Sequence, residues 1–190
     1  MARPYAPPVS TDDGADGRRA LLERLVLPWR TVPAVVYDRH LTIRIVNDLA
    51  RALHRTFRPG ANLARSAFLP SGDGARAGSS VDPAGTTPVG ARLAAELRRS
   101  LDEHHQDRGY VELIGELAAR SAAFAQFWAE PDGAEPSGVV GFALHGTGRV
   151  VLAYHRFSVP GPDGDTLLLW HGADDTSTGR LAALARSLHD

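Results

Sequence analysis

The stretch 110–128 constrains the fold most, because it combines one apolar stripe at helical spacing with a following run of short apolar strands. The stripe consists of Tyr110, Leu113, Ile114, Leu117, Ser121, Phe124 and Trp128. This spacing predicts a single long amphipathic helix. Its apolar side must be buried against another element. The sheet that follows is the expected partner, and a small molecule could sit between the two.

Alternating apolar residues and turn sequences predict five strands. They are expected at 33–37, 41–46, 139–145, 149–159 and 166–172. In the second strand, Leu41, Ile43 and Ile45 are expected to share one buried face. Asp38 lies in the turn between the first two strands and is expected to cap it. Glycine-rich turns join the last three strands into a meander.

Helical spacing also predicts shorter helices on both sides of the first strands. They are expected at 19–27, 48–57, 91–101 and 178–188. Asn47 is the expected N-cap of the second one, and Leu21, Leu22, Leu25 and Val26 are expected on one side of the first. This order predicts an α+β fold, a single PAS-like domain. Its five-stranded antiparallel sheet has helices covering one face, and its first strand lies in the middle and pairs with the last.

Two segments are poor in large apolar side chains. Residues 1–18 are rich in Pro, Gly and Asp and are expected to form a disordered tail. The PAS-like domain is then expected over 19–190. Within it, 71–90 is a flexible insertion, which is either a disordered surface loop or a lid over a pocket.

Composition excludes several classes of function. The net charge of −1 argues against a protein that binds nucleic acid over its whole surface. The absence of cysteine excludes disulfides, thiolate catalysis and cysteine-based metal sites. No run of apolar residues is long enough for a membrane span, and no secretory signal is present, so we expect a cytoplasmic protein.

The chain resembles a known family over nearly the whole of its expected domain. The matching residues are Pro33–Arg39, Asn47, Ala50–Leu53, Asn62–Arg65, Phe68, Leu69, Leu113, Glu116, Leu117, Arg120, Ser121, Phe124, Trp128, His145, Gly148, Leu152, Tyr154 and Leu167–Trp170. In this order they resemble the MmyB-like ligand-binding domain, the C-terminal half of many actinobacterial Xre-type helix-turn-helix transcription regulators. The residues before 20 are too few for a helix-turn-helix, so direct DNA binding is not expected from this chain alone.

The resemblance implies a cavity for a small, largely apolar ligand, such as a fatty-acyl molecule. It supplies no catalytic motif, and we expect no cofactor. Our predicted ligand-binding residues are Leu117, Phe124, Trp128, Phe142, Tyr154 and Trp170. Aromatic residues on an amphipathic helix also serve simply as core, and that reading stays open.

Histidines and carboxylates are the remaining candidates for chemistry. His104 and His105 are expected in a solvated loop, and His145 is too far along the strand from His155 to share a metal with it. His155 and His171 can form a close pair on the outer face, depending on the strand register. Two histidines without a carboxylate are a poor metal site, so no metal site is predicted. Glu116 is expected to face solvent.

Two classes of function remain, besides a relic that lost its regulator half and keeps only a dimerisation surface. The first is a regulatory sensor of a small apolar ligand, whose output is a homodimer contact or a contact with a partner regulator. The alternative is a stand-alone enzyme or carrier acting on a hydrophobic natural-product intermediate in the same cavity, with His155 and His171 as its catalytic candidates. No membrane contact is expected in either case.

Overall fold

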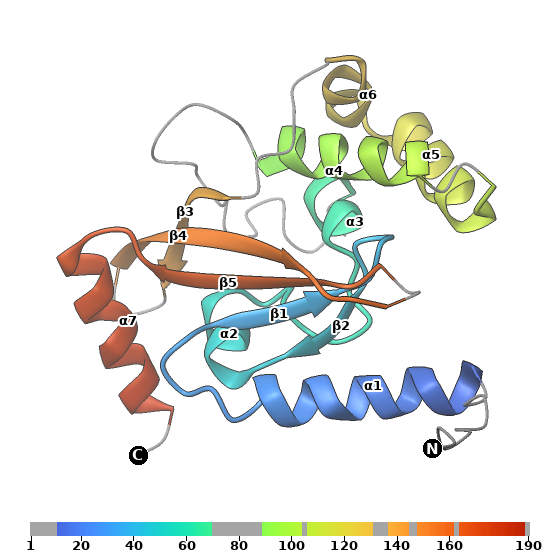
Figure 1. Ribbon diagram of the computed structural model, residues 1–190. Coiled ribbons are helices and arrows are strands. Elements are labelled where there is room, and N and C mark those ends of the chain that lie inside the picture. Colours follow the sequence, from blue (N-terminus) through green and yellow to red (C-terminus); the bar gives the residue numbers. More distant parts are fainter. Residues whose placement is uncertain are drawn as a thin grey trace, which may run out of the picture.

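The chain folds as a five-stranded antiparallel sheet with helices on both sides (Figure 1). The computed structural model describes residues 11–69, 89–103, 106–130, 137–144, 148–161 and 164–188. The strands are β1 (Ala34–Tyr37), β2 (Ile43–Val46), β3 (Ser137–Leu144), β4 (Gly148–Ser158) and β5 (Thr166–Gly172). Their spatial order is β2-β1-β5-β4-β3. The predicted α+β class is therefore confirmed, as is the pairing of the first strand with the last, and the order is consistent with a PAS-like layout.

The β1–β2 hairpin contains an irregularity that the alternation pattern does not reveal. Val36 lies opposite Ile45, whereas the next residue of β1, Tyr37, lies opposite Ile43, so Arg44 is an extra residue in β2. Such a bulge reverses the faces of the side chains that follow it. Ile43 accordingly packs into the main core, while Ile45 packs into a second cluster on the other face. The prediction that these two isoleucines share a face is wrong.

Within the part of the chain that the structure describes, five consecutive helices between β2 and β3 contribute side chains to the main core on the inner face of the sheet. They are α2 (Asp48–Leu53), α3 (Leu63–Phe68), α4 (Val89–Glu103), α5 (Arg108–Arg120) and α6 (Ala122–Ala129). Asn47 caps α2 as predicted, because its side chain accepts a hydrogen bond from the N–H of Ala50. The predicted insertion at 71–90, His104, His105 and His145 lie outside the described residues, apart from the first two residues of α4.

The stretch 110–128 forms two helices rather than the single one predicted. Ser121 has an extended backbone (φ −138°, ψ 106°) and separates α5 from α6. Its side chain accepts a hydrogen bond from the N–H of Phe124, and its own N–H donates to the carbonyl of Leu117. Serine competes for backbone hydrogen bonds in this way and therefore favours helix ends. The break allows α6 to pack against both α4 and α5.

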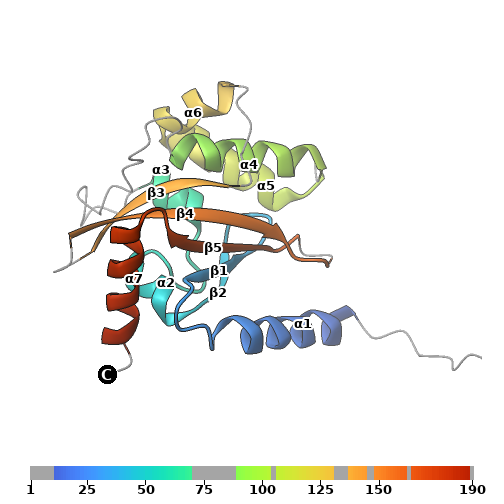
Figure 2. The same cartoon turned by 60° about the vertical axis from the view of Figure 1, so that its left-hand side comes forward.

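The outer face of the sheet is covered in part by α1 (Thr11–Val26) and flanked by α7 (Asp175–Ser187) (Figure 2). Helix α1 therefore begins at Thr11 rather than at residue 19, and it adds a helix to the face that was expected to be bare. Leu22 and Val26 pack against the sheet. Leu21 and Leu25, which the helical spacing groups with Leu22 and Val26, are exposed.

Candidate functional site

The six predicted ligand-binding residues all lie in or against the main core on the inner face. Leu117, Phe124, Phe142, Tyr154 and Trp170 are buried, and Trp128 is partly buried. Leu117 is on α5, Phe124 and Trp128 are on α6, and the other three are on the sheet. The structure thus brings residues from the helical cover and from the sheet into one apolar interior.

The aromatic rings of this interior form two packed groups. On the helical side, Phe124 stacks on Trp128 with ring centroids 5.4 Å apart and meets Phe68 edge-on at 5.1 Å. On the sheet side, Trp170 contacts Phe57 at 5.2 Å and Phe142 at 6.2 Å. Contacts of this kind contribute beyond simple burial. The described rings therefore pack against one another, and their role as a ligand-binding wall stays a prediction.

Two arginines of α4 lie over the edge of this aromatic interior. The guanidinium of Arg92 lies 5.3 Å from the ring centroid of Tyr154, and that of Arg98 lies 5.2 Å from the ring of Trp128. Arg98 also donates hydrogen bonds to the backbone carbonyls of Phe127, Trp128 and Glu130. These bonds give further partners to the carbonyls at the C-terminal end of α6. They attach α6 to α4.

A buried ion pair that the sequence reasoning missed lies beneath α4. Arg156 on β4 is paired with Glu96 on α4, and their side chains are 12% and 16% exposed. The hydroxyl of Tyr37 donates a 2.7 Å hydrogen bond to the other oxygen of Glu96. Burial, assisted by the Glu96 carboxylate, raises the pKa of Tyr37 well above its usual value. Tyr37 therefore stays protonated and remains a donor.

A pattern in the sequence indicates one member of this ion pair, Arg156. In β4, the inward-facing positions are Val150, Leu152 and Tyr154, so strict alternation makes Arg156 the next inward residue. An arginine at such a position needs a buried partner. The partner itself, Glu96, lies 60 residues away and carries no local signal.

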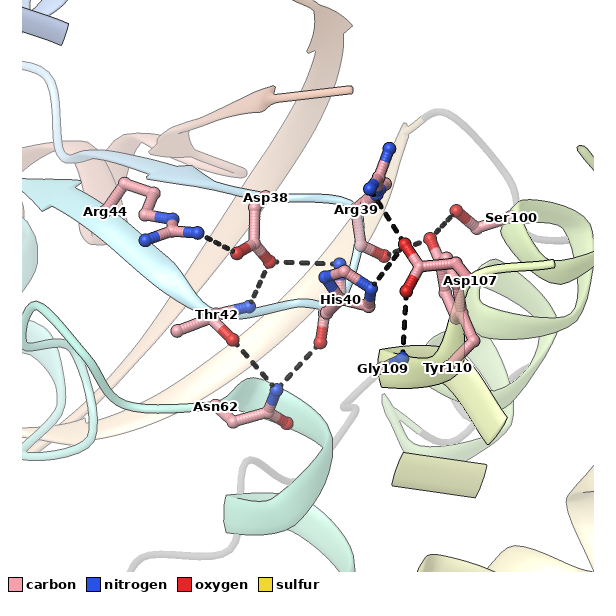
Figure 3. Close-up of polar contacts among 10 residues, drawn as sticks. All are labelled: Asp38, Arg39, His40, Thr42, Arg44, Asn62, Ser100, Asp107, Gly109 and Tyr110. Atoms are coloured by element: carbon pink, nitrogen blue, oxygen red, sulfur yellow. Dashed lines mark hydrogen bonds and ion pairs between the residues drawn. The ribbon is translucent and has the colours of Figure 1, made fainter. Parts of the chain in front are cut away.

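The turn after β1 is organised by Asp38, as predicted (Figure 3). One oxygen of its carboxylate accepts hydrogen bonds of 2.9 Å from the backbone N–H groups of His40 and Thr42. The other oxygen is 2.7 Å from the guanidinium of Arg44. Asp38 is buried, and these contacts account for both carboxylate oxygens. Its role is to hold the turn.

A second carboxylate, Asp107, connects this turn to the start of α5 (Figure 3). It ion-pairs with Arg39 at 2.8 Å and His40 at 3.0 Å, and it caps α5 by accepting from Gly109. Although partial burial opposes ionisation, the Gly109 N–H and the contacts with His40 and Arg39 lower the pKa of Asp107. Tyr110 completes the connection by donating to the carbonyl of Arg39 at 2.7 Å. The network fixes the helical cover to the sheet.

The outer face carries an open cleft of about 930 Å³ between β4, β5, α7 and residues 30–32. Its lining residues are Arg30, Thr31, Val32, His155, Phe157, Leu169, Trp170, His171, Gly172, Thr178, Leu181, Ala182, Ala185 and Arg186. Of the six predicted ligand-binding residues, Trp170 alone is among them. Trp170 therefore borders both the aromatic interior and this outer cleft.

The sequence matches the model of a known protein family. The model of the MmyB-like transcription regulator ligand binding domain matches residues 18–184, which is nearly the whole chain. The chain belongs to this family. No curated protein matched it. Membership supports a regulatory, ligand-sensing role for the protein.

In this MmyB-like domain, His155 and His171 form a close pair on the outer face. Neither stands directly opposite the other, because His155 pairs with Leu169 and His171 with Ala153. Their Nε2 atoms are nevertheless 3.2 Å apart. Nδ1 of His171 donates to the carbonyl of Gly172 at 2.9 Å, so in the neutral ring Nε2 of His171 is the acceptor and Nε2 of His155 the donor. Both residues are exposed.

The other candidates for acid–base chemistry in the MmyB-like domain are held in ion pairs. Glu116 contacts Arg65 at 2.7 Å and Arg120 at 2.9 Å, and the hydrogen bond from Arg65 lowers its pKa. It is only partly exposed and links α5 to α3. Within the described residues, no three histidine or acidic side chains gather as a group that could hold a metal ion. Nor does that part of the chain contain a helix suited by length and apolarity to span a membrane.

Proposed function

We propose that this MmyB-like domain senses a small apolar ligand, of fatty-acyl character, held between the sheet and helices α4 to α6. The proposed contacts are Leu117, Phe124, Trp128, Phe142, Tyr154 and Trp170. The observation that carries the proposal is the composition of this interior, in which aromatic groups from the helical cover and from the sheet face the same core. Apolar walls with a few polar groups are typical of ligand sites.

The ligand would enter by displacing α6. This helix has only eight residues and is joined to α5 through the single non-helical residue Ser121. Its two interior rings, Phe124 and Trp128, would then exchange their contacts with each other and with Phe68 for contacts with the ligand. The backbone hydrogen bonds from Arg98 give a defined resting position to which α6 returns.

The polar end of such a ligand would lie near Arg156. This residue follows Tyr154 at the next inward position of β4 and is held by Glu96 and Tyr37. A polar ligand group beside Arg156 would gain charge-assisted hydrogen bonds from its guanidinium. Additional hydrogen bonds of this kind also help to offset the cost of burying an ion pair. We propose that occupancy changes the contact of the domain with a partner regulator or with a second copy.

The proposal is tested first with the purified protein. Native mass spectrometry after expression should reveal a co-purified lipid-like molecule. Titration with dansyl-labelled undecanoic acid should then show binding that weakens by about tenfold in Phe124→Ala and Trp128→Ala, since each removes a large apolar contact. Val111→Ala is the matched control, because Val111 lies on the exposed side of α5.

Variants of buried aromatics can also unfold the protein, so thermal melting accompanies each titration. Phe142→Leu, which keeps the side chain apolar and similar in volume, provides a folded variant at the same wall. If folded Phe124→Ala, Trp128→Ala and Phe142→Leu all bind the probe as tightly as the parent, the proposed site is wrong.

A further inference from the structure

The outer face of the sheet is only half covered. Strand pairing places Ile45, Val36, Leu167 and Phe157 in one row across β2, β1, β5 and β4. Helix α1 covers the first two of these side chains. Phe157 at the other end of the row is 52% exposed. Contiguous exposed apolar surface marks an interaction site, so what surrounds Phe157 decides its meaning.

The first wall of this uncovered surface is the flank of α1. Leu21 and Leu25 each precede a residue that packs on the sheet, Leu22 and Val26, so they lie on one side of the helix. Arg18 lies on the same side, and its guanidinium occupies the space next to Gly161, in the β4–β5 turn. This side of α1 therefore faces β4 and β5. Leu21 and Leu25 are 56% and 54% exposed.

The second wall is α7, and here the surface becomes the outer cleft. Leu181, Ala182 and Ala185 line it from α7, and Phe157 and Leu169 form its floor. The groove has strands β4 and β5 as its floor, and α7 and residues 30–32 line its sides.

The charged residues that line the groove within the described part of the chain are both positive. They are Arg30 and Arg186, beside the pair His155 and His171, and no described lining residue is Asp or Glu. Among the described residues, Arg30 and Arg186 take part in no ion pair. The groove is therefore complementary to a surface that is apolar in the middle and acidic at its edge.

We propose that this groove docks an amphipathic helix of a partner protein, with leucine-like residues on one side and Asp or Glu beside them. A helix completes the layer that α1 and α7 begin on this face. A small molecule is less suited, because ligand pockets usually enclose most of the ligand, whereas the floor residue Phe157 lies half exposed. A second copy using the same face would bring the same arginines into contact with these.

Trp170 connects this groove to the aromatic interior. It is 3% exposed, contacts Phe57 and Phe142 on the inner side and borders the groove on the outer side. Leu181 and Ala185 of α7 also belong both to the main core and to the groove. A ligand that moved Trp170 would therefore change the docking surface. This coupling rests on the proposed function, whereas docking itself does not.

The test uses the full chain and a fluorescein-labelled synthetic helix of about 18 residues, with leucines at i, i+3, i+4 and i+7 and glutamates on both flanks. Fluorescence anisotropy should give a dissociation constant in the micromolar range that rises with salt. Phe157→Asp should abolish binding, and the double variant Arg30→Glu and Arg186→Glu should weaken it by about tenfold. These positions are exposed, so the fold should persist. Val111→Asp and Arg58→Glu, on other surfaces, are the matched controls.

Three results would overturn the proposal. The first is equal binding of a peptide with lysine in place of glutamate, or of a scrambled peptide. The second is a dimer in sedimentation velocity that Phe157→Asp disperses, which assigns the groove to a second copy. The third is binding of dansyl-labelled undecanoic acid that depends on Phe157 and not on Phe124, which assigns the groove to a small ligand. Failure of the acyl probe to bind at all would overturn the proposed function and leave the docking result standing.

Discussion

Tyr154 of β4 lies directly opposite Trp170 of β5. Because side chains alternate along a strand, this register turns both aromatic residues inward and their chain neighbours, His155 and His171, outward. This pairing therefore places the two aromatic side chains of the sheet in the aromatic interior. It also brings the two imidazoles to within 3.2 Å of each other on the opposite face. A shift of one residue between these strands would exchange the two sets.

Asn47 should be among the most sensitive polar positions. Its side chain accepts hydrogen bonds from the N–H groups of Ala34 and Ala50 and donates to the carbonyls of Trp29 and Val32. We expect Asn47→Ala to lower the free energy of unfolding by about 3 kcal/mol in urea denaturation, since buried backbone groups lose their partners. Asp174→Ala, which removes an exposed cap of α7, should cost about 1 kcal/mol. Equal losses would show that the links of Asn47 to β1 and to residues 29–32 contribute nothing.

The buried ion pair should behave as a unit. Glu96→Leu leaves the charge of Arg156 without its carboxylate and should destabilise the fold by about 3 kcal/mol. Replacing both residues by leucine should recover most of that loss, because two buried charges are then exchanged for apolar contact. A double-mutant cycle of urea unfolding measures the coupling. Additive effects of the two substitutions would mean that the pair is not coupled in solution.

Gly172 and Gly179 should respond in opposite directions to alanine. A Cβ on Gly172 would overlap the backbone of Thr178, so Gly172→Ala must push α7 away from β5. We expect a loss of about 2 kcal/mol in thermal unfolding. Gly179 lies within α7 with no neighbouring atom in reach, so Gly179→Ala should stabilise the protein by about 1 kcal/mol. Tolerance of alanine at 172 would contradict the close contact of α7 with the sheet.

Tyr110 should give the fold a dependence on alkaline pH. Burial raises the pKa of Tyr110 to about 12, from an ordinary value of 10.0. The unfolded state therefore loses its proton first, so the stabilisation is complete below pH 10 and is lost as the pH rises towards 12. Urea unfolding across this interval should show a shallower loss of stability in Tyr110→Phe than in the parent.

At neutral pH, the same Tyr110→Phe variant should cost about 1 kcal/mol, because the hydrogen bond to the carbonyl of Arg39 is removed. Tyr37, whose pKa is also raised, remains in the variant and preserves part of the alkaline response. If the free energy of unfolding falls with pH above 10 as steeply in the variant as in the parent, Tyr110 does not contribute to the alkaline response.

Local signals were enough to predict most elements of this fold. The alternation of apolar residues and the glycine-rich turns predicted all five strands, and Asn47 predicted a helix start correctly. The two main errors, in the faces of β2 and in the length of the helix at 110–128, each arise at a single residue. Arg44 is an extra residue in β2, and a pattern of alternation does not show where the partner strand skips a residue. Ser121 interrupts a helical stripe that continues at the right spacing on both sides of it.

The sequence by itself determined the elements, their order and the apolar residues available for the interior, because these depend on neighbours only a few positions apart. Tertiary structure alone decided that Glu96 would meet Arg156, that Trp170 would border both the interior and the outer cleft, and that Arg30 and Arg186 would share one groove. The physical reason is that these contacts join residues far apart in the chain. They depend on strand register and on how the helices pack, and neither can be inferred from a short stretch of residues.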